Sequence, residues 1–488
     1  MTFAETITQN AGSPRIQHNP ITDGASACTY AELPALLDQL GNLLQAQGVG
    51  SGDCVAVECA NSLAGALTLL YLLQQGRSFM LLPPTGKQDQ DLKPVPAFCQ
   101  YRLVIAPPAA RSMDKTIPQQ LADALRVERL DSYDPAQDHA DRSTARLYLR
   151  TSGSMGTAKI VVHTHDALLR NAQNCVAHYG YASDDRVCIP VPIFHFYGFG
   201  AAFLPAVLAG AAIDVQHGAN LIKYLHREKH FHPNIAVLTP SLCEMLSHGF
   251  QQPRHYKLAV TSGQRIKAEL FRSFDQSVGG CLVNQYGSSE MGATAACLPA
   301  DPLETRALMV GRPMPGVVLQ AAAEADGAAP QGVLRCQHPC GFEGYVDETG
   351  AWLHRTVPGG WYSTGDLVKT HPDGELEVLG RADNSLNRRG YLVLLTDIEK
   401  ALEQIPAISQ AIVVASEQEN MQGQQLTAFC LPHPGSQPST EQIRANCFEM
   451  LPPYARPDSI QLIDRYPMLP SGKIDRQALR ARTLEPTP

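Results

Sequence analysis

The sequence has no excess of positive charge and few charged residues of either sign. Among its 488 residues, 39 Lys and Arg stand against 47 Asp and Glu, so the formal net charge is −8, and charged residues make up 18%. Such a chain lacks the basic surface that nucleic acids and anionic membranes require, which argues against both as partners. Apolar residues make up 44%, so we expect an ordered chain long enough for two large domains or about three smaller ones.

Long apolar runs are also missing. The two longest, residues 64–73 and 201–213, are shorter than the roughly 18 residues of a membrane-spanning helix, and Pro205 interrupts the second. The N-terminus lacks the basic and apolar stretches of a secretory signal, so we expect a cytoplasmic protein. Its 13 scattered cysteines are then expected to be reduced core thiols. Cys336, His338 and Cys340 have no partner cluster that would complete a zinc site.

Helical and strand-like patterns alternate along the first 300 residues. Leucines recur at helical spacing over residues 30–47, and a strand-like apolar run follows at 54–59. Short apolar segments at 235–238, 258–260 and 282–284 each run into a loop rich in Gly, Ser, Thr or Pro. The alternation predicts an α/β fold, and ligands of open α/β sheets bind at such carboxyl ends of strands.

After Gly311 the pattern changes to short alternating strands with Gly, Pro and Asp turns, which predicts a β subdomain. A polar stretch rich in Asn and Arg, residues 383–390, is typical of a linker. We therefore predict that residues 1–382 form a large N-terminal domain of layered α/β subdomains plus this β subdomain. Residues 383–488 are predicted to form a small α+β domain whose helix begins near Thr396.

Residues 151–159 have the composition of a phosphate-binding loop. Directly after a predicted strand they combine four hydroxyl residues, two glycines and Lys159. Hydroxyls and unhindered backbone N–H groups bind phosphate, and the lysine adds a cation for a polyphosphate. The GxxxxGK[ST] spacing of a Walker loop is absent. Taken alone, this composition fits a flexible surface loop equally well.

Four further segments occur in the order in which one enzyme superfamily has them. They are Asn284 to Glu290 (NQYGSSE), Tyr362 to Leu367 (YSTGDL), Gly380 to Asp383 (GRAD) with Arg389 and Gly390, and Pro470 to Arg476 (PSGKIDR). With the phosphate loop and Val161, Val162 and His165, they resemble the motifs of the adenylate-forming superfamily. That superfamily includes acyl-CoA and aryl-CoA synthetases, adenylation domains of nonribosomal peptide synthetases, and beetle luciferase. The resemblance covers nearly the whole chain, with departures at Met155, Ala158, Ile160 and Ser289.

The resemblance implies that a carboxylate attacks the α-phosphorus of ATP, giving an acyl-adenylate and pyrophosphate, and that a thiol then displaces AMP. The first step brings two anions together, so it needs cations and hydrogen-bond donors fixed beforehand. Glu290 would bind Mg2+ as a hard oxygen ligand, and Ser289 would donate to the α-phosphate. Lys473 would bridge the substrate carboxylate and ATP.

The remaining nucleotide contacts are implied in the same way. Tyr286, between Gln285 and Gly287, would stack on adenine, although its residue type alone also fits a core aromatic. Asp366 would accept hydrogen bonds from both ribose hydroxyls, and Arg381 would reach the ribose and phosphate. The β- and γ-phosphates would be held by Thr151, Ser152, Gly153, Ser154, Gly156 and Lys159.

The resemblance also implies that the small domain is mobile and rotates between the two half-reactions. Asp383 occupies the hinge position, and a hinge needs few residues and no special chemistry. Rotation would withdraw Lys473 and bring Gly390, beside the pantetheine tunnel, to the active site.

The segment from Val191 to Phe199, VPIFHFYGF, resembles the PxFHxxG segment that borders the acid pocket of acyl- and aryl-CoA synthetases. His195 and Phe196 are its candidate pocket residues, although His195 alone is more simply interpreted as a core histidine. Amino-acid adenylation domains usually have an aspartate here, and no acid occurs between Val191 and Ala212. The expected substrate is therefore a fatty or aromatic carboxylic acid without an α-amine. The other pocket candidates are Thr239, Ser262, Gly263, Gly287 and Gly292.

The sequence ends soon after Lys473, so we expect the thiol to come from outside, as CoA or as the phosphopantetheine arm of a separate carrier protein. Three alternatives remain open: an amino-acid-activating enzyme, an amide-forming ligase that passes the acyl group to an amine, and a noncatalytic adenylate-binding protein. The departures in the phosphate loop favour the last. Retention of Glu290, Asp366, Arg381 and Lys473 argues against it.

Overall fold

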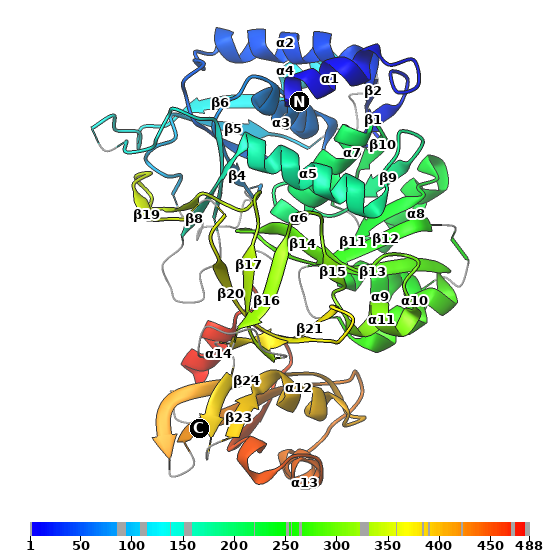
Figure 1. Ribbon diagram of the computed structural model, residues 1–488, viewed down its shortest axis with the longest axis vertical. Coiled ribbons are helices and arrows are strands. Elements are labelled where there is room, and N and C mark those ends of the chain that lie inside the picture. Colours follow the sequence, from blue (N-terminus) through cyan, green and yellow to red (C-terminus); the bar gives the residue numbers. More distant parts are fainter. Residues whose placement is uncertain are drawn as a thin grey trace. The chain divides into compact units, whose positions relative to one another are not determined.

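The computed structural model forms two compact units (Figure 1). The first comprises Met1–Leu319, Cys336–Tyr362 and Asp373–Leu376, and the second comprises Gln320–Arg335, Ser363–Pro372 and Glu377–Pro488. The predicted domain boundary between residues 382 and 383 remains a prediction. The structure describes residues 2–84, 94–107, 115–136, 138–150, 159–218, 220–249, 253–254, 256–262, 266–322, 331–357, 359–382, 385–388, 391–420, 423–469 and 474–483.

The first unit contains an eight-stranded sheet within the residues that the structure describes. Strand β3 pairs in parallel with β4 and β5, and its five residues are all buried, as expected of a strand covered on both faces. The strand order is β19 (Trp352–Arg355), β18 (Gly344–Val346), β8 (Ile160–Thr164), β7 (Arg146–Arg150), β4 (Phe79–Leu82), β3 (Val55–Cys59), β5 (Tyr101–Ile105) and β6 (Leu125–Arg129).

A second sheet of the first unit has nine strands in the described part of the chain. Strands β11, β12 and β13 are parallel, so their carboxyl ends meet at one edge. The strand order is β15 (Arg312–Pro313), β14 (Gly292–Ala296), β13 (Gly280–Ser288), β12 (Tyr256–Ser262), β11 (Ile235–Leu238), β9 (Arg186–Ile189), β10 (Ala212–Val215), β1 (Pro20–Thr22) and β2 (Ala27–Thr29). The strands predicted at 235–238, 258–260 and 282–284 are confirmed.

The leucine-rich segment forms the predicted helix. A 3-10 turn, η1 (Tyr30–Glu32), leads into α2 (Leu33–Ala46), and five of its leucines are buried while Leu43 is half-buried. The other helices of this unit are α1 (Phe3–Gly12), α3 (Leu63–Gln74), α4 (Ile117–Ala124), α5 (His165–Tyr179), α6 (Phe196–Gly198), the π-helical η3 (Phe199–Phe203), α7 (Leu204–Ala209), α8 (Leu221–Phe231), α9 (Pro240–Gly249), α10 (Ala268–Ser277) and α11 (Leu303–Leu308). Among the described residues, no helix is both long and apolar enough to cross a membrane.

Helix α5 joins the two sheets of the first unit into one core. Its N-cap Thr164 accepts the Ala167 N–H, and Gly180 ends it in the left-handed conformation. Leu168 and Ala172 of α5 pack in one cluster with residues of both sheets, while α8, α9, α10 and α11 cover the nine-stranded sheet beside β11, β12 and β13 (Figure 1).

The predicted β subdomain is only partly correct. A four-stranded sheet, most of it in the second unit, has the described strands in the order β16 (Val318–Ala322), β17 (Gln331–Gln337), β20 (Tyr362–Thr370) and β21 (Leu376–Arg381). Strands β18 and β19 instead extend the eight-stranded sheet, because β18 pairs with β8. Alternating apolar residues predict a strand but do not identify its partner.

The rest of the second unit is the α+β body predicted for the end of the chain. Its helix α12 (Leu395–Glu403) begins at the expected position. Three strands, β24 (Ile408–Asn420), β25 (Gly423–Pro432) and β26 (Ser459–Leu462), form a sheet in the described residues, with α13 (Thr440–Met450), the 3-10 turn η5 (Pro453–Ala455) and α14 (Arg476–Arg482).

The stretch predicted as a linker contains a strand. Ser385–Arg388 form β22, which pairs with β23 (Tyr391–Leu394). Leu386 is buried, and the fully buried Arg388 forms an ion pair with Asp458. The prediction was wrong for these residues because a polar composition does not reveal that an arginine is buried against a distant acid.

Candidate active site

The Ser289–Glu290 turn joins β13 to β14 at the carboxyl end of β13, where the resemblance places the α-phosphate donor and the metal ligand. Glycines flank the turn for steric reasons. Gly292 has φ +67°, and a Cβ there would lie 2.4 Å from Asn171 Oδ1. A Cβ on Gly287 would lie 2.3 Å from the Gly292 carbonyl oxygen. A side chain at position 287 would therefore push β13 and β14 apart, whereas one at position 292 would meet Asn171 of α5 and would strain a left-handed backbone.

Glu290 is half-buried and held by Tyr345 of β18 and by Phe342, which precedes β18 by two residues. The Tyr345 hydroxyl donates to Glu290 Oε1 at 3.0 Å, and the Phe342 N–H donates to the Glu290 carbonyl at 2.8 Å. Tyr345 also meets the Tyr362 hydroxyl at 3.1 Å, and Lys159 Nζ lies 5.1 Å from the centre of its ring. Burial and the nearby Glu290 charge raise the pKa of Tyr345, so its hydroxyl keeps its proton.

The residues around Glu290 fit a magnesium ion bound together with a nucleotide. Within the described residues, no group of three or more His, Cys, Asp or Glu could hold a metal ion by itself. Mg2+ is typically bound by one or two carboxylates together with substrate phosphates, and Glu290 offers a hard oxygen of this kind.

His163 fixes the other residue of the turn. It lies on β8, four residues after Lys159, and is fully buried. Its Nε2 is 2.6 Å from the Ser289 carbonyl oxygen, which can only accept, so Nε2 has the proton. Burial lowers the pKa of His163 to about 4, which keeps the ring neutral near pH 7. Phe196 packs on its ring at 5.1 Å between centroids.

The adenine candidates lie on β13. Gln285 is buried and accepts a hydrogen bond from the Tyr179 hydroxyl at 3.0 Å. Tyr286 is half-buried, and its carbonyl accepts from Thr294 Oγ1 at 3.2 Å. Gly287 is exposed. A half-buried Tyr286 keeps part of its ring accessible for stacking, so its role remains a prediction.

The candidates for the acid pocket occupy two different settings. Phe196 is buried among His163, Gly200 and Gly292, whereas His195 is half-buried beside Phe194 at 4.4 Å between ring centroids.

Thr239 and Ser262 make local hydrogen bonds at the carboxyl ends of β11 and β12. Thr239 Oγ1 accepts the Leu242 N–H, and Ser262 Oγ donates to the Gln285 carbonyl at 2.7 Å. The nearby Tyr197 hydroxyl donates to the carbonyls of Leu238 and Val260, near the ends of the same two strands. Tyr197 therefore links the carboxyl-terminal parts of β11 and β12 through its hydroxyl.

The two ribose candidates contact each other in the second unit. Arg381 Nη1 lies 3.3 Å from Asp366 Oδ1 and donates to the Thr364 carbonyl at 2.8 Å. Thr364 Oγ1 in turn accepts the Asp366 N–H at 3.1 Å. Gly365, between Thr364 and Asp366 in the sequence, has φ +73°, and a Cβ there would lie 2.8 Å from Arg381 Nη2. The GD pair of the motif thus places a carboxylate against a cation, and the left-handed backbone at Gly365 favours glycine over a residue with a side chain.

Several predicted residues lie outside the described part of the chain, so their roles remain predictions. In the described part of the PSGKIDR motif, Asp475 caps α14, and Arg476 Nη1 binds Glu399 at 2.8 Å. Asn387, beside the predicted tunnel loop, lies on β22. The predicted residues outside the description are Thr151, Ser152, Gly153, Ser154, Gly156, Gly263, Asp383, Gly390 and Lys473.

The three candidate zinc ligands form no metal cluster in the described residues. His338 Nδ1 accepts the Cys340 N–H at 2.9 Å, and Nε2 lies 3.3 Å from the Ala293 carbonyl. Both ring nitrogens are thus engaged in backbone hydrogen bonds, and His338 supports the loop next to β14.

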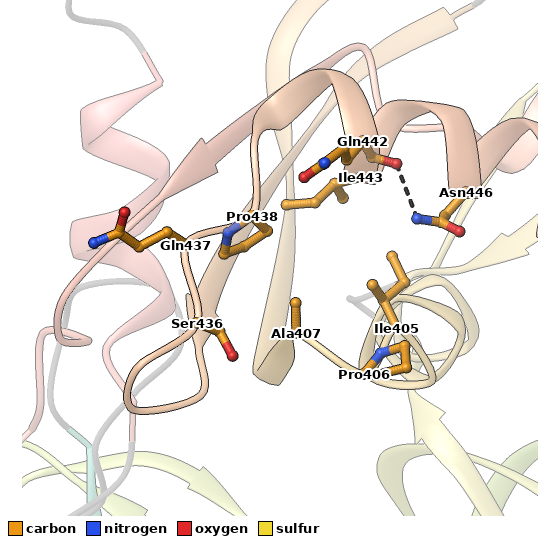
Figure 2. Close-up of a pocket in the computed structure, with 9 residues that line it drawn as sticks. All are labelled: Ile405, Pro406, Ala407, Ser436, Gln437, Pro438, Gln442, Ile443 and Asn446. Atoms are coloured by element: carbon orange, nitrogen blue, oxygen red, sulfur yellow. Dashed lines mark hydrogen bonds between the residues drawn. The ribbon is translucent and has the colours of Figure 1, made fainter.

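A groove of about 530 Å3 lies on the second unit (Figure 2). It runs between the first turns of α13 and the connection from α12 to β24, and none of its lining residues belongs to a predicted motif. Its lining combines apolar side chains with three amides and one hydroxyl, and none of the lining residues is charged. The lining residues are Ile405, Pro406, Ala407, Ser436, Gln437, Pro438, Gln442, Ile443 and Asn446.

Sequence reasoning missed His163, Asn171 and Tyr345. His163 follows the phosphate loop and Tyr345 follows Gly344, but neither lies in a segment whose composition indicates phosphate chemistry. Asn171 is fully buried on α5 and bonds to the backbone of Gly200 and Ala293. A buried polar residue on an otherwise apolar helix face was the one available signal for it.

Comparison with known proteins identifies matches over most of the chain. Residues 4–346 match the model of the AMP-binding enzyme family, and residues 397–473 match that of the AMP-binding enzyme C-terminal domain. The chain is 23% identical to a salicylyl-CoA synthase / salicylate adenylyltransferase of Streptomyces sp, over 94% of the chain and 90% of that protein. It is 28% identical to a linear gramicidin synthase of Brevibacillus parabrevis, over 93% of the chain but only 9% of that much longer protein.

Two solved structures show the same fold. An O-succinylbenzoate coenzyme A synthetase from Bacillus subtilis, in complex with AMP, superposes with a TM-score of 0.80 at 20% identity, covering 99% of this chain and 98% of that one. An amide bond synthetase from Marinactinospora thermotolerans superposes with a TM-score of 0.77 at 21% identity, covering 98% and 99%. The predicted α/β fold, with a large N-terminal and a small C-terminal domain, is confirmed.

Proposed function

Because the chain belongs to the AMP-binding enzyme family, we propose that it uses ATP to activate a carboxylic acid as an acyl-adenylate, with release of pyrophosphate, and then transfers the acyl group to a thiol. The observation that carries the proposal is the Ser289–Glu290 turn. It lies at the carboxyl end of a parallel strand, and the Tyr345 hydroxyl holds its carboxylate in place. Ligands of such sheets bind at this edge.

The residues of the chain would bind and orient the reactants. Ser289 donates to the α-phosphate, the 151–159 loop holds the outer phosphates, and Asp366 accepts from the ribose hydroxyls. Mg2+ bound at Glu290 would supply positive charge that offsets the repulsion between the phosphates and the incoming carboxylate. Lys473 adds a second positive charge at the reacting carboxylate.

We propose a fatty or aromatic acid as the substrate. The absence of an acid between Val191 and Ala212 supports this, because no carboxylate of that segment can pair with an α-ammonium group. Similarity to the salicylyl-CoA synthase supports an aromatic acid, and similarity to the gramicidin synthase keeps an amino acid as the alternative.

The acceptor we propose is CoA or a phosphopantetheine arm on a separate carrier protein, and both present the same thiol. An amine acceptor is the second candidate, which the shared fold with the amide bond synthetase supports. Mass spectrometry of reactions with CoA, a pantetheinylated carrier and simple amines separates these three products.

The experiment that tests the proposal is acid-dependent ATP–pyrophosphate exchange. Fatty acids of several lengths, benzoates, cinnamates and amino acids are each supplied with ATP and Mg2+. Exchange with a fatty or aromatic acid is the expected result. Exchange with amino acids alone would contradict the interpretation of the His195 segment, and ATP binding without exchange for any acid would favour a noncatalytic adenylate-binding protein.

A further inference from the structure

Two side chains that would contact neither ATP nor the acid hold the Ser289–Glu290 turn, which we propose binds nucleotide and metal. His163 donates from Nε2 to the Ser289 carbonyl at 2.6 Å. Tyr345 donates from its hydroxyl to Glu290 Oε1 at 3.0 Å. Both residues come from one pair of antiparallel strands, β8 and β18, in which Tyr345 lies opposite Val161. The turn is therefore held by two paired strands, and one of them, β8, directly follows the predicted phosphate loop.

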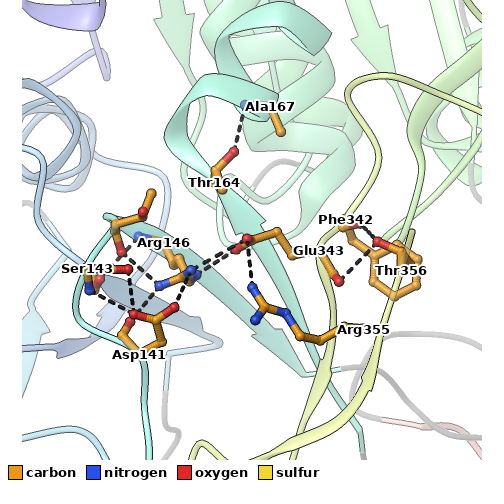
Figure 3. Close-up of polar contacts among 11 residues, drawn as sticks. Asp141, Ser143, Arg146, Thr164, Ala167, Phe342, Glu343, Arg355 and Thr356 are labelled. Carbon is orange, nitrogen blue, oxygen red and sulfur yellow. Dashed lines mark hydrogen bonds and ion pairs between the residues drawn. The ribbon is translucent and has the colours of Figure 1, made fainter. Parts of the chain in front are cut away.

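The strand pair is itself rigidly anchored (Figure 3). Arg146 of β7 is buried and binds Glu343 Oε2 through Nε at 2.6 Å and Asp141 Oδ2 through Nη2 at 3.0 Å. The Glu343 N–H donates to the Val162 carbonyl at 2.8 Å, next to His163. Glu343 precedes Tyr345 by two residues, so the network limits movement of the segment that holds Glu290. A site of this kind needs such supporting contacts to keep its groups in position.

The side chain and the backbone of Glu290 are held separately. Tyr345 binds Oε1 of the carboxylate, while the Phe342 N–H and His163 Nε2 bind the backbone carbonyls of Glu290 and Ser289. The backbone of the turn and one oxygen of its carboxylate are therefore both fixed by hydrogen bonds. A hydroxyl donor can orient a carboxylate without neutralising its charge, which a lysine or arginine at this place would do.

We propose that His163 and Tyr345 are positioning residues for the magnesium–nucleotide complex. His163 sets the place of the Ser289 turn and thereby of its donor to the α-phosphate, and Tyr345 sets the orientation of the Glu290 carboxylate toward Mg2+. The inference rests on the proposed function, because it assumes that ATP binds at this turn.

The test is ATP binding by calorimetry, without any acid so that no turnover occurs, in MgCl2 and separately in EDTA. Tyr345→Phe removes one hydroxyl and keeps the ring that faces Lys159. It is expected to weaken ATP binding about 10- to 150-fold in Mg2+, the factor that corresponds to loss of one hydrogen bond to a charged group, and to leave binding in EDTA unchanged. His163→Leu is expected to weaken binding by a similar factor in both buffers.

Two matched variants separate positioning from folding. Tyr362→Phe removes the hydroxyl that meets Tyr345 but leaves the bond to Glu290, so ATP affinity should stay within about 3-fold of wild type. His163→Gln keeps an N–H donor and is expected to recover most of the binding that His163→Leu loses. If His163→Leu does not fold, the milder Tyr345→Phe and His163→Gln variants decide the question.

Wild-type affinity for ATP in both buffers in Tyr345→Phe and His163→Leu would overturn the inference while leaving the proposed function intact. A loss in Tyr345→Phe that is equal in Mg2+ and EDTA would also overturn it, because the hydroxyl would then act on the fold and not through the metal ligand. Failure of the wild-type protein to bind ATP would overturn the proposed function together with the inference.

Discussion

Arg388 Nη2 lies 2.7 Å from each carboxylate oxygen of Asp458, and the arginine is fully buried. The same guanidinium donates through Nη1 to the Arg456 carbonyl at 2.9 Å, and Asp458 Oδ2 accepts the Leu426 N–H at 2.7 Å. The pair ties β22 to the body of the second unit, and Arg388 precedes the predicted tunnel residue Gly390 by two positions in the sequence.

Removing one partner of this pair should destabilise the second unit. Arg388→Ala would leave Asp458 without its cation and is expected to cost about 3–5 kcal/mol in the free energy of unfolding. Calorimetric unfolding of the full chain is the measurement, because both tryptophans, Trp352 and Trp361, lie in the first unit and their fluorescence reports on that unit.

Lys400→Ala is the matched control for the Arg388 prediction. It breaks an exposed ion pair with Asp397 in the same unit, and exposed pairs contribute about 0–1 kcal/mol. Equal, small effects of the two variants would show that the buried pair does not hold the unit together.

Asp366 should make the affinity for ATP depend on the ribose hydroxyls. Asp366→Asn loses the charge and one of the two acceptors, so its affinity for ATP is expected to fall about 10- to 100-fold. The matched ligand is 2′-deoxy-ATP, which lacks one of the hydroxyls that Asp366 would bind. In wild type it should bind more weakly than ATP, and in Asp366→Asn the difference between the two nucleotides should shrink. An unchanged difference would place the ribose elsewhere.

The fold and part of the site could be predicted from local patterns. The leucine spacing of α2 determined both its helical state and its buried face, since one stripe of a helix must pack on the core. Gly287 precedes the predicted Ser289–Glu290 segment because a Cβ there would lie 2.3 Å from the Gly292 carbonyl oxygen across the hairpin. Such features depend on neighbours in sequence, and the motif of residues 284–290 includes Gly287.

The features that could not be predicted depend on partners far along the chain. Tyr345 is 55 residues from Glu290, and Arg388 is 70 residues from Asp458. A tyrosine in a short alternating strand has the same local signature whether it faces solvent, the core or a carboxylate such as that of Glu290. For that reason the alternation after Gly311 predicts a β subdomain but not that β18 pairs with β8 and brings Tyr345 next to Glu290.

His338 should make stability depend on pH. Burial lowers its pKa to about 4 from an ordinary value near 6.5, and protonation of Nδ1 would break its hydrogen bond from the Cys340 N–H. Between these two pH values the unfolded chain binds the proton and the folded chain does not. The contribution is therefore complete above pH 6.5 and is lost as the pH falls to about 4, by up to about 3 kcal/mol.

Chemical unfolding at pH 7.5 and pH 5 measures this loss. His338→Asn keeps an acceptor for the Cys340 N–H but cannot titrate, so its stability should fall less between the two pH values than that of wild type. His354→Asn, at an exposed position of β19, is the matched control and should behave as wild type does. The same slope in all three proteins would exclude His338 as a source of the acid sensitivity.

The two half-reactions should respond to different residues of the small domain. If Lys473 adds positive charge at the reacting carboxylate only during adenylation, Lys473→Ala should slow acid-dependent pyrophosphate exchange about 100- to 1000-fold and largely spare thiolysis of a supplied acyl-adenylate. Arg480→Ala, which removes an exposed cation of the adjacent helix α14, should change neither rate by more than about 2-fold.

A bulky residue in place of Gly390 should have the opposite effect to Lys473→Ala. It should slow thiolysis and largely spare adenylation, since it would narrow the path of the thiol and leave the adenylation site untouched. Equal loss of both half-reactions in Lys473→Ala, or earlier loss of adenylation in the Gly390 variant, would contradict rotation of the domain between two catalytic positions.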